Sequence, residues 1–366
     1  MKRTFLDQHI HNFLQILSGS NQPLDLSLSN YFRAHKNLGS TDRRVLGDLI
    51  YGMVRWKTLI DHFAPVNRVE FYRQIDWEKI LQDTAIPKSA RLGLPEFIYA
   101  RFCKSFGEEQ ANILGQILNQ TAPTTVRVNL LKTTRDHLLD LWKDRFIISP
   151  CNHSQEGIRF HKREPLFALP EFKAGLFEIQ DEGSQIVSKE VAAKPGDSVL
   201  DYCSGSGGKT LAFAPRMQGK GQIYLHDIRE SALGEARRRL KRAGIQNAQC
   251  LAPNHPQMSR LIGKCDWVLI DVPCSGTGTL RRNPDHKWKI DAVLVEHYIQ
   301  EQRTIAKEAC KYLKPGGKLV YTTCSLLAEE NIDQIQHIPL TLDKEPLFLL
   351  PQPGGMDGFF SAVFRK

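Results

Sequence analysis

The sequence predicts an α/β protein in which residues 176–366 fold as a Rossmann-like, doubly wound sheet. Strand-like and helical segments alternate from Leu176 onward, which is typical of a parallel sheet covered by helices on both faces. A glycine-rich turn at residues 203–208 follows the first strand, and Asp227 follows the second. Glycines in such a turn let the backbone approach a ligand closely.

Residues 1–85 are predicted to form an all-α module that precedes this sheet. Apolar side chains recur at helical spacing in two stretches: Phe5, Leu6, Ile10, Phe13, Leu14 and Leu17, then Val45, Leu46, Leu49, Ile50, Met53, Val54, Leu59, Ile60 and Phe63. Ser40 or Thr41 is available as the N-cap of the second stretch. The pattern does not decide whether the module binds a partner or braces the chain.

Residues 86–175 are predicted to form a small α+β domain. Helices are expected at residues 107–118 and 134–142, and strands at 124–130, 146–149 and 157–161. This β-α-β-β unit resembles a small RNA-binding sheet. It lacks the aromatic pair on a central strand that stacks bases in the common single-strand readers.

The strands of the large sheet follow in order. They are expected at residues 198–202, 222–226, 248–251, 267–270 and 319–322, with a terminal strand over 358–364. Residues 314–317, Lys-Pro-Gly-Gly, provide a natural stop for the helix before the fifth strand.

Composition favours a nucleic-acid partner. The chain has 366 residues, enough for two or three domains, and 49 Lys and Arg against 40 Asp and Glu. This excess favours polyanionic partners, although a solubilising surface has the same composition. No apolar run of about 18 residues and no secretory signal is recognised. Because the eight cysteines form no Cys-x-x-Cys pair, we expect a reduced, cytoplasmic protein without a zinc site or disulfide framework.

Two basic clusters have different expected roles. Residues 237–242 contain five Arg and Lys side chains, which are expected to form a solvated helix face. Arg281 and Arg282 follow the loop that contains Cys274, so they are predicted to contact phosphate at the rim of the ligand crevice.

The glycine turn has two functional interpretations. Its Gly-Lys-Thr ending suggests a phosphate-binding P-loop, but that loop needs a glycine five residues before Gly208, where this chain has Cys203. A nucleoside-binding turn fits better, because Asp227 lies 19 residues after Gly208, where an acid binds ribose hydroxyls. Dinucleotide enzymes and S-adenosylmethionine enzymes share this arrangement, and a purely structural turn is the remaining alternative.

Cys274 and Cys324 each follow a predicted buried strand, so both thiols are expected at one crevice. A thiolate adds covalently to an electron-poor carbon, and a second polar group then manages the departing proton. The alternative is two ordinary buried cysteines. We interpret five other cysteines as ordinary structural thiols: Cys103, Cys151, Cys250, Cys265 and Cys310.

The residues around these two thiols resemble motifs of the Nol/Nop/Sun family of RNA cytosine-5 methyltransferases. Residues 271–278 with 281–285, Asp-Val-Pro-Cys-Ser-Gly-Thr-Gly and Arg-Arg-Asn-Pro-Asp, resemble its fourth motif. Residues 321–325, Tyr-Thr-Thr-Cys-Ser, resemble its sixth. The resemblance extends over nearly all of residues 176–366 and implies a class I methyltransferase sheet.

Three further segments carry the same resemblance. Residues 180–185 and 357–362 fit the family on either side of the sheet. Residues 40–63 are similar to the NusB-like module of the bacterial members that modify small-subunit ribosomal RNA.

The resemblance implies a covalent mechanism with S-adenosylmethionine as methyl donor and no metal. Cys324 would attack carbon 6 of cytosine, and Cys274 would assist release of the product. Asp271 would bind the amino edge and ring nitrogen of the base, and Lys209 would assist through its charge. DNA cytosine-5 methyltransferases attack with the Pro-Cys thiol instead, which would reverse the two cysteine roles.

The resemblance also implies a cofactor site and an RNA partner. The cofactor residues would be Cys203, Ser204, Gly205, Ser206, Gly207, Gly208, Lys209, Asp227, Asn254 and Asp271. Ribosomal RNA is the expected substrate of a monomeric enzyme, with transfer RNA as the alternative, and the target cytosine would be unstacked into the crevice. A non-catalytic RNA-binding assembly factor on the same fold is the competing function.

The sequence departs from the family pattern in three places. Gly205-Ser206 stands where family members commonly have Ala-Pro. Asn254 stands where an acidic residue is expected to meet the adenine amino group. The amino-terminal module is shorter than its relatives.

Overall fold

The computed structural model describes residues 2–20 and 22–366, which divide into two compact units. Unit 1 comprises Met1–Thr121 with Thr279–Ala292, and unit 2 comprises Ala122–Gly278 with Val293–Lys366. The three-part division predicted from the sequence, with boundaries after residues 85 and 175, stays a prediction. None of the described helices is long and apolar enough to cross a bilayer.

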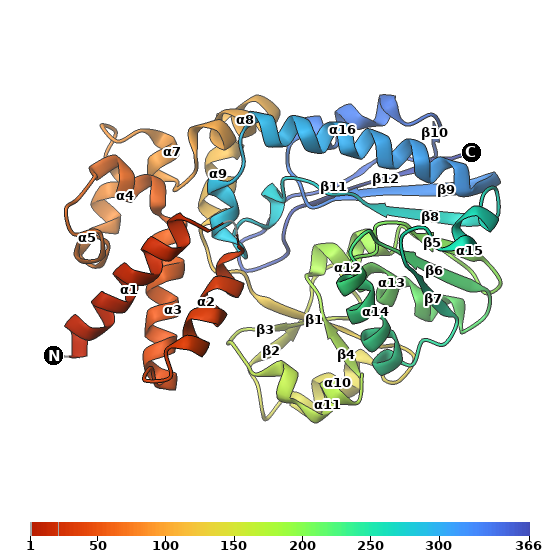
Figure 1. Ribbon diagram of the computed structural model, residues 1–366, viewed down its shortest axis with the longest axis horizontal. Helices are drawn as coiled ribbons and strands as arrows, with labels where there is room; N and C mark the ends of the chain where they lie inside the picture. Colours follow the sequence, from red (N-terminus) through yellow and green to blue (C-terminus); the bar gives the residue numbers. More distant parts are fainter. Residues whose placement is uncertain (1, 21) are drawn as a thin grey trace. The chain divides into compact units, whose positions relative to one another are not determined.

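Unit 1 is helical, as the periodicity of its sequence predicts (Figure 1). Its helices are α1 (Lys2–Ser18), α2 (Leu24–Ala34), α3 (Ser40–Arg55), α4 (Lys57–Phe63), α5 (Arg68–Gln74), α6 (Trp77–Gln82), α7 (Lys88–Arg91), α8 (Glu96–Phe106) and α9 (Glu108–Leu118), with a 3-10 helix at Pro284–Trp288. The apolar faces of α1, α2 and α3 meet in one core around Phe13 and Ile50. The predicted cap is wrong: Gly39 is the N-cap of α3, because Ser40 already belongs to the helix.

A distant segment, residues 279–292, completes unit 1. Trp288 packs against the helical core, and its indole Nε1 donates a hydrogen bond to the carbonyl of Val54 (3.0 Å). Lys287 is wholly buried, and its ammonium donates to the side-chain oxygen of Asn119. Burial lowers the pKa of Lys287 well below its ordinary value. These buried bonds make the segment a structural part of the unit.

Unit 2 contains two sheets, of which the smaller has the strand order β2-β3-β1-β4. Its elements are β1 (Thr124–Val128), α10 (Arg135–Trp142), β2 (Ile148–Pro150), β3 (Gly157–Phe160), α11 (Pro170–Lys173) and β4 (Phe177–Ile179). All its strand pairs are antiparallel. Trp142 fills the core beneath the sheet, with its ring centroid 5.4 Å from Phe160 and 5.2 Å from Phe177. The predicted β-α-β-β order is confirmed, and β4 was missed.

The larger sheet has eight strands in the order β10-β12-β9-β8-β5-β6-β7, with β11 paired to β12. The strands are β5 (Ser198–Asp201), β6 (Gln222–His226), β7 (Ala248–Leu251), β8 (Cys265–Asp271), β9 (Leu313–Thr323), β10 (Thr341–Leu342), β11 (Leu347–Leu349) and β12 (Phe359–Arg365). The helices are α12 (Glu182–Ser188), α13 (Gly208–Phe213), α14 (Glu230–Ala243), α15 (Pro256–Arg260) and α16 (Ala292–Ala309). Strands β5 to β9 pair in parallel, and β12 is antiparallel to β9.

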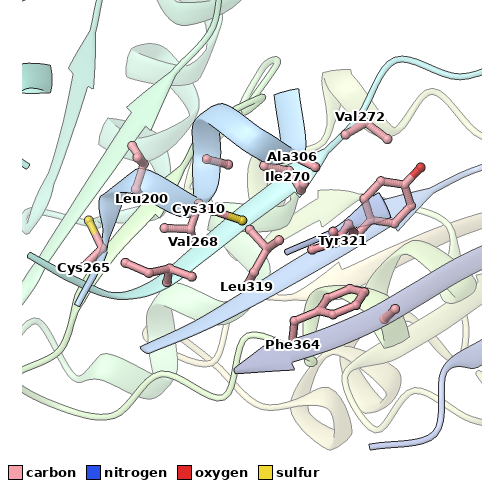
Figure 2. Close-up of a cluster of buried hydrophobic side chains, with 14 of the residues drawn as sticks. Leu200, Cys265, Val268, Ile270, Val272, Ala306, Cys310, Leu319, Tyr321 and Phe364 are labelled. Atoms are coloured by element: carbon pink, nitrogen blue, oxygen red, sulfur yellow. The ribbon is translucent and has the colours of Figure 1, made fainter. Parts of the chain in front are cut away.

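Successive residues of each central strand point to opposite faces, so the sheet has two cores. Val268 and Ile270 of β8 join one core with Ala306 of α16 (Figure 2). Leu269, between them, joins the other core with Leu233 of α14. Burial on both faces explains why these strands are continuous apolar runs. The predicted Rossmann-like fold class is confirmed, as are all six predicted strands.

The structure differs from the prediction before the fifth strand. Helix α16 ends at Ala309, and residues 314–317 lie within β9 rather than at the end of a helix. Cys265 pairs with Leu313 and Trp267 pairs with Lys318, so an irregularity in the strand pairing accommodates the Pro-Gly-Gly residues. Such irregular pairing is a common place for glycine in a strand.

Candidate active site

The parallel strands β8 and β9 bring Cys274 and Cys324 together. Asp271, the last residue of β8, pairs with Thr322 near the end of β9, so the chain leaves both strands at the same edge of the sheet. Cys324 follows β9 directly, and the Pro-Cys loop returns Cys274 to it, with 3.5 Å between the two Sγ atoms. Both thiols are free and partly accessible. The two thiols therefore meet at one edge of the sheet, and the expected ligand crevice there stays a prediction.

An ion pair lies beside the thiols at the ends of β8 and α13. The Lys209 ammonium contacts Asp271 Oδ2 at 2.6 Å, and the Thr322 hydroxyl donates to Asp271 Oδ1 at 3.0 Å. Lys209 is buried, whereas the Asp271 side chain is 37% exposed. Burial alone would lower the pKa of Lys209, but the Asp271 carboxylate outweighs it, so the pKa is raised. Asp271 is therefore held in place with part of its carboxylate open to a ligand.

The two thiols differ in acidity because they share one hydrogen bond. The hydrogen bond with Cys274 lowers the pKa of Cys324, against the opposing effect of burial, and the Lys209 charge lowers it further. The same hydrogen bond, followed by burial, raises the pKa of Cys274 well above its ordinary value. Cys324 is therefore the thiol that ionises first.

The glycine turn connects β5 to α13 and lies against Asp227. Gly205 and Gly207 have φ angles of +53° and +77°, which favour glycine. The Gly205 N–H donates to Asp227 Oδ2 (2.8 Å), so the acid after β6 and the turn after β5 form one site. Hydrogen bonds, led by those from Arg229, lower the pKa of Asp227 despite the opposing effect of burial, the largest influence.

The structure does not favour the P-loop interpretation, because the lysine and the threonine of the Gly-Lys-Thr ending have other partners. Lys209 pairs with Asp271, and the Thr210 hydroxyl donates to Asp201 (2.6 Å). Both side chains are therefore engaged by acids of the sheet. Among the described residues, no group of three or more His, Cys, Asp or Glu side chains is arranged to hold a metal ion.

Buried polar groups at the turn retain unused bonding capacity. Asp201 Oδ1 and Ser204 Oγ are buried without a hydrogen-bond partner. Burial raises the pKa of Asp201 to about 7 and raises that of the Cys203 thiol well above its ordinary value. Other cofactor candidates are less enclosed: Ser206 is half-buried, like Gly205 and Gly208, and Asn254 is exposed in the left-handed region (φ +63°) after β7.

The small sheet supports the turn from behind, which the sequence analysis missed. Arg127 of β1 donates to the carbonyl of Gly208 (3.2 Å). Arg239 of α14 donates to the carbonyl (3.0 Å) and hydroxyl (2.7 Å) of Ser206 and pairs with Glu178 of β4 (3.1 Å). Only long-range contacts assemble this support, so no local pattern in the sequence could have indicated it.

Arg281 and Arg282 belong to unit 1 rather than to the unit that holds the thiols. Arg281 is 1% exposed, and its carbonyl accepts a hydrogen bond from Arg55 (3.1 Å). Arg282 is half-buried. Their predicted contact with RNA phosphate stays a prediction.

Comparison with known proteins places this geometry in a family. The family model described as 16S rRNA methyltransferase RsmB/F matches residues 189–348. The model of the ferredoxin-like domain of these proteins matches residues 94–166. A solved structure of a methyltransferase homolog protein from Pyrococcus horikoshii is 29% identical, with a TM-score of 0.64 over 76% of this chain and 97% of that one.

Two curated relatives carry the same name, ribosomal RNA small subunit methyltransferase B. The protein from Vibrio vulnificus is 32% identical over 270 residues, which are 70% of this chain and 63% of that protein. The protein from Salmonella dublin is 34% identical over 318 residues, which are 81% of this chain and 71% of that protein. The chain thus spans about two thirds of their length, and it belongs to the RsmB/F family of 16S rRNA methyltransferases.

Proposed function

We propose that this protein transfers a methyl group from S-adenosylmethionine to carbon 5 of a cytosine in 16S ribosomal RNA. The observation that carries the proposal is the Cys274–Cys324 pair, 3.5 Å apart, in which the pKa of Cys324 is lowered. Membership of the RsmB/F family supports the reaction class and the RNA substrate. The protein would act as a monomer in the cytoplasm.

The residues of the glycine turn fit S-adenosylmethionine. Asp227 is an acid at the end of the second strand, where ribose hydroxyls bind in such folds. Ser204 Oγ and Asp201 Oδ1 are buried and free to bond with a polar ligand. We assign the turn from Cys203 to Gly208 and Asp227 to the cofactor, and Asn254 to the adenine edge. The cofactor supplies an electrophilic methyl group when bound.

In the proposed reaction, the Cys324 thiolate forms a bond to carbon 6 of cytosine. The electrons of the carbon 5–carbon 6 double bond make carbon 5 nucleophilic, and carbon 5 takes the methyl group. A base takes the proton from carbon 5, the electrons of that carbon–hydrogen bond restore the double bond, and the sulfur leaves carbon 6 as a thiolate. Cys274, whose pKa is raised, is the partner that assists this release.

Asp271 and Lys209 are assigned to binding the cytosine rather than to removing its proton at carbon 5. The exposed part of the Asp271 carboxylate accepts from the cytosine amino group, and Thr322 and Lys209 hold it in position. The Lys209 charge also favours the thiolate form of Cys324. The cytosine must leave its helix to reach this edge of the sheet.

The test is incubation of the purified protein with labelled S-adenosylmethionine and each of three RNA fractions. We expect label in 16S ribosomal RNA, with a protected cytosine on bisulfite sequencing of that RNA. Label in transfer RNA alone would mean that transfer RNA, and not 16S ribosomal RNA, is the substrate. Cofactor binding without label in any fraction would favour a non-catalytic assembly factor.

A further inference from the structure

A carboxylate inside unit 2 connects the two loops that carry the thiols. Glu330 is fully buried after β9. Its Oε1 atom accepts hydrogen bonds from the backbone N–H of Ser275 (2.8 Å) and from Gln302 (3.1 Å). Its Oε2 atom accepts from the hydroxyls of Ser275 and Ser325. Ser275 follows Cys274, and Ser325 follows Cys324.

The atoms around Glu330 are themselves held. Gln302 of α16 also donates to the carbonyl of Pro273, the residue before Cys274 (2.9 Å). The Tyr321 hydroxyl of β9 donates to the backbone carbonyl of Glu330 (2.6 Å). The side chain that joins the two cysteine loops is therefore fixed to both the strand and the covering helix.

We propose that Glu330 is a positioning residue that holds the Cys274 and Cys324 loops in register, so that their sulfurs stay in contact. A carboxylate is an acceptor-only group, and here four donors from three residues converge on its two oxygens. Glutamine would replace one of the two acceptor oxygens by an NH2 group, so the donors on that side would have to turn away or, for the Ser275 and Ser325 hydroxyls, accept instead of donate. The proposal rests on the proposed function for its catalytic consequence, but not for its geometry.

Electrostatics argue against a role in activating the nucleophile. A negative charge near a thiol opposes ionisation, and Glu330 acts to raise the pKa of both Cys274 and Cys324. Burial also raises the pKa of Glu330 itself. A buried carboxylate thus works against thiolate formation, so its contribution to the site is the geometry that it enforces.

Glu330→Gln separates the two roles, because it removes the charge and one acceptor oxygen while keeping the size of the side chain. Two rates are measured: closure of a Cys274–Cys324 disulfide by diamide, which accepts the two protons and two electrons that the thiols lose, and alkylation of Cys324 by iodoacetamide. We expect disulfide closure to slow by about tenfold or more, because the sulfurs lose their alignment. Alkylation is expected to stay equal or become faster.

The same variant is tested in methyl transfer. We expect kcat to fall by about tenfold to 100-fold, with the KM for RNA and the affinity for S-adenosylmethionine little changed. Glu345→Gln is the matched control, because it makes the same change on an exposed residue of unit 2. Ser275→Ala and Ser325→Ala each remove one hydroxyl donor and should give smaller losses of both rates.

Wild-type disulfide closure and wild-type kcat in Glu330→Gln would overturn the proposal. If Glu330→Gln does not fold, the two serine variants decide in the same way. If the wild-type protein methylates no RNA but disulfide closure still depends on Glu330, only the proposed function fails. If the wild-type protein is active and the variants match it, only the positioning role fails.

Discussion

At the scale of single residues, Cys324 and Cys274 have the same side chain and opposite acid–base behaviour. One hydrogen bond between them stabilises the charge of Cys324 and keeps the proton on Cys274. Lys209 adds its charge on the side of Cys324 and is itself kept protonated by Asp271. The difference in acidity therefore comes from the groups around each thiol. For this reason, physical argument from the two sequence motifs alone could not rank the acidity of the thiols.

Exchange of each thiol for a hydroxyl should have distinct results, because a serine does not ionise near neutral pH. Cys324→Ser is expected to lose the covalent adduct with RNA that contains 5-azacytidine. With ordinary cytosine-containing RNA, Cys274→Ser is expected to form the adduct and release it slowly, whereas the wild-type protein releases it. Each variant should lower turnover by about 100-fold or more. Denaturing gels of the crosslinked protein measure the difference, and the opposite pattern would exchange the two roles.

The lowered pKa of Cys324 predicts how its reactivity depends on pH. The thiolate is the reactive form, so alkylation of Cys324 should fall as the pH drops through its lowered pKa, below the ordinary thiol value of about 8.5. Cys274→Ala removes the largest cause of that lowering, so the alkylation profile should move to higher pH. Peptide mass spectrometry after alkylation at graded pH measures both profiles. An unchanged profile in the variant would contradict the hydrogen-bond explanation.

At the scale of elements, features that depend on neighbouring residues can be predicted from the sequence. Contacts between residues far apart in the chain cannot. The central strands are predictable because burial on both faces makes them apolar runs, and the glycine turn because its backbone needs glycine. The short edge strands β10 and β11 have two and three residues and no such pattern. The support of the turn by Arg127 and the Glu330 bridge both join residues far apart in sequence. No periodicity predicts contacts of that kind.

Gly207→Ala should weaken cofactor binding through the backbone of the turn. A left-handed conformation costs a residue with a Cβ atom about 1–2 kcal/mol. The added carbon would also lie 3.3 Å from Leu225 Cδ2. We expect the affinity for S-adenosylmethionine to fall by about tenfold, measured by calorimetry.

Gly219→Ala is the control for that change. Gly219 has a similar φ of +71° but open space where the Cβ atom would lie, outside the turn. It should lose comparable stability and keep its cofactor affinity. Equal losses of affinity in both variants would mean that the effect is not specific to the turn.

At the scale of the whole molecule, the two units are not consecutive lengths of chain. Residues 279–292 leave unit 2, complete the helical unit 1, and return to α16 of unit 2. Trp288 and Lys287 anchor them within the helical core. Unit 1 therefore depends on residues that lie, in the sequence, between two segments of unit 2.

Trp288→Ala should destabilise the helical unit selectively. Loss of the indole leaves a gap in the core and removes the hydrogen bond to Val54, at a cost of up to about 3 kcal/mol. Hydrogen exchange should become faster in α1 and α3 and change little in β5, β8 and β9. Val293→Ala, at a position 79% exposed, should leave both regions unchanged. Equal loss of protection in both units would show that they unfold together.

The return of residues 279–292 to the helices has a consequence for biosynthesis. A ribosome releases the first nine helices long before it has made the peptide that finishes their interior. Until roughly 170 more amino acids have emerged, the apolar surface that residues 279–292 will cover stays exposed on the nascent helices. Chaperones recognise surfaces of this kind. A fragment of residues 1–121 would lack residues 279–292, and a fragment of residues 122–366 would contain them without the helices that they complete. A soluble helical fragment therefore requires residues 279–292 to be fused to it or added as a separate peptide.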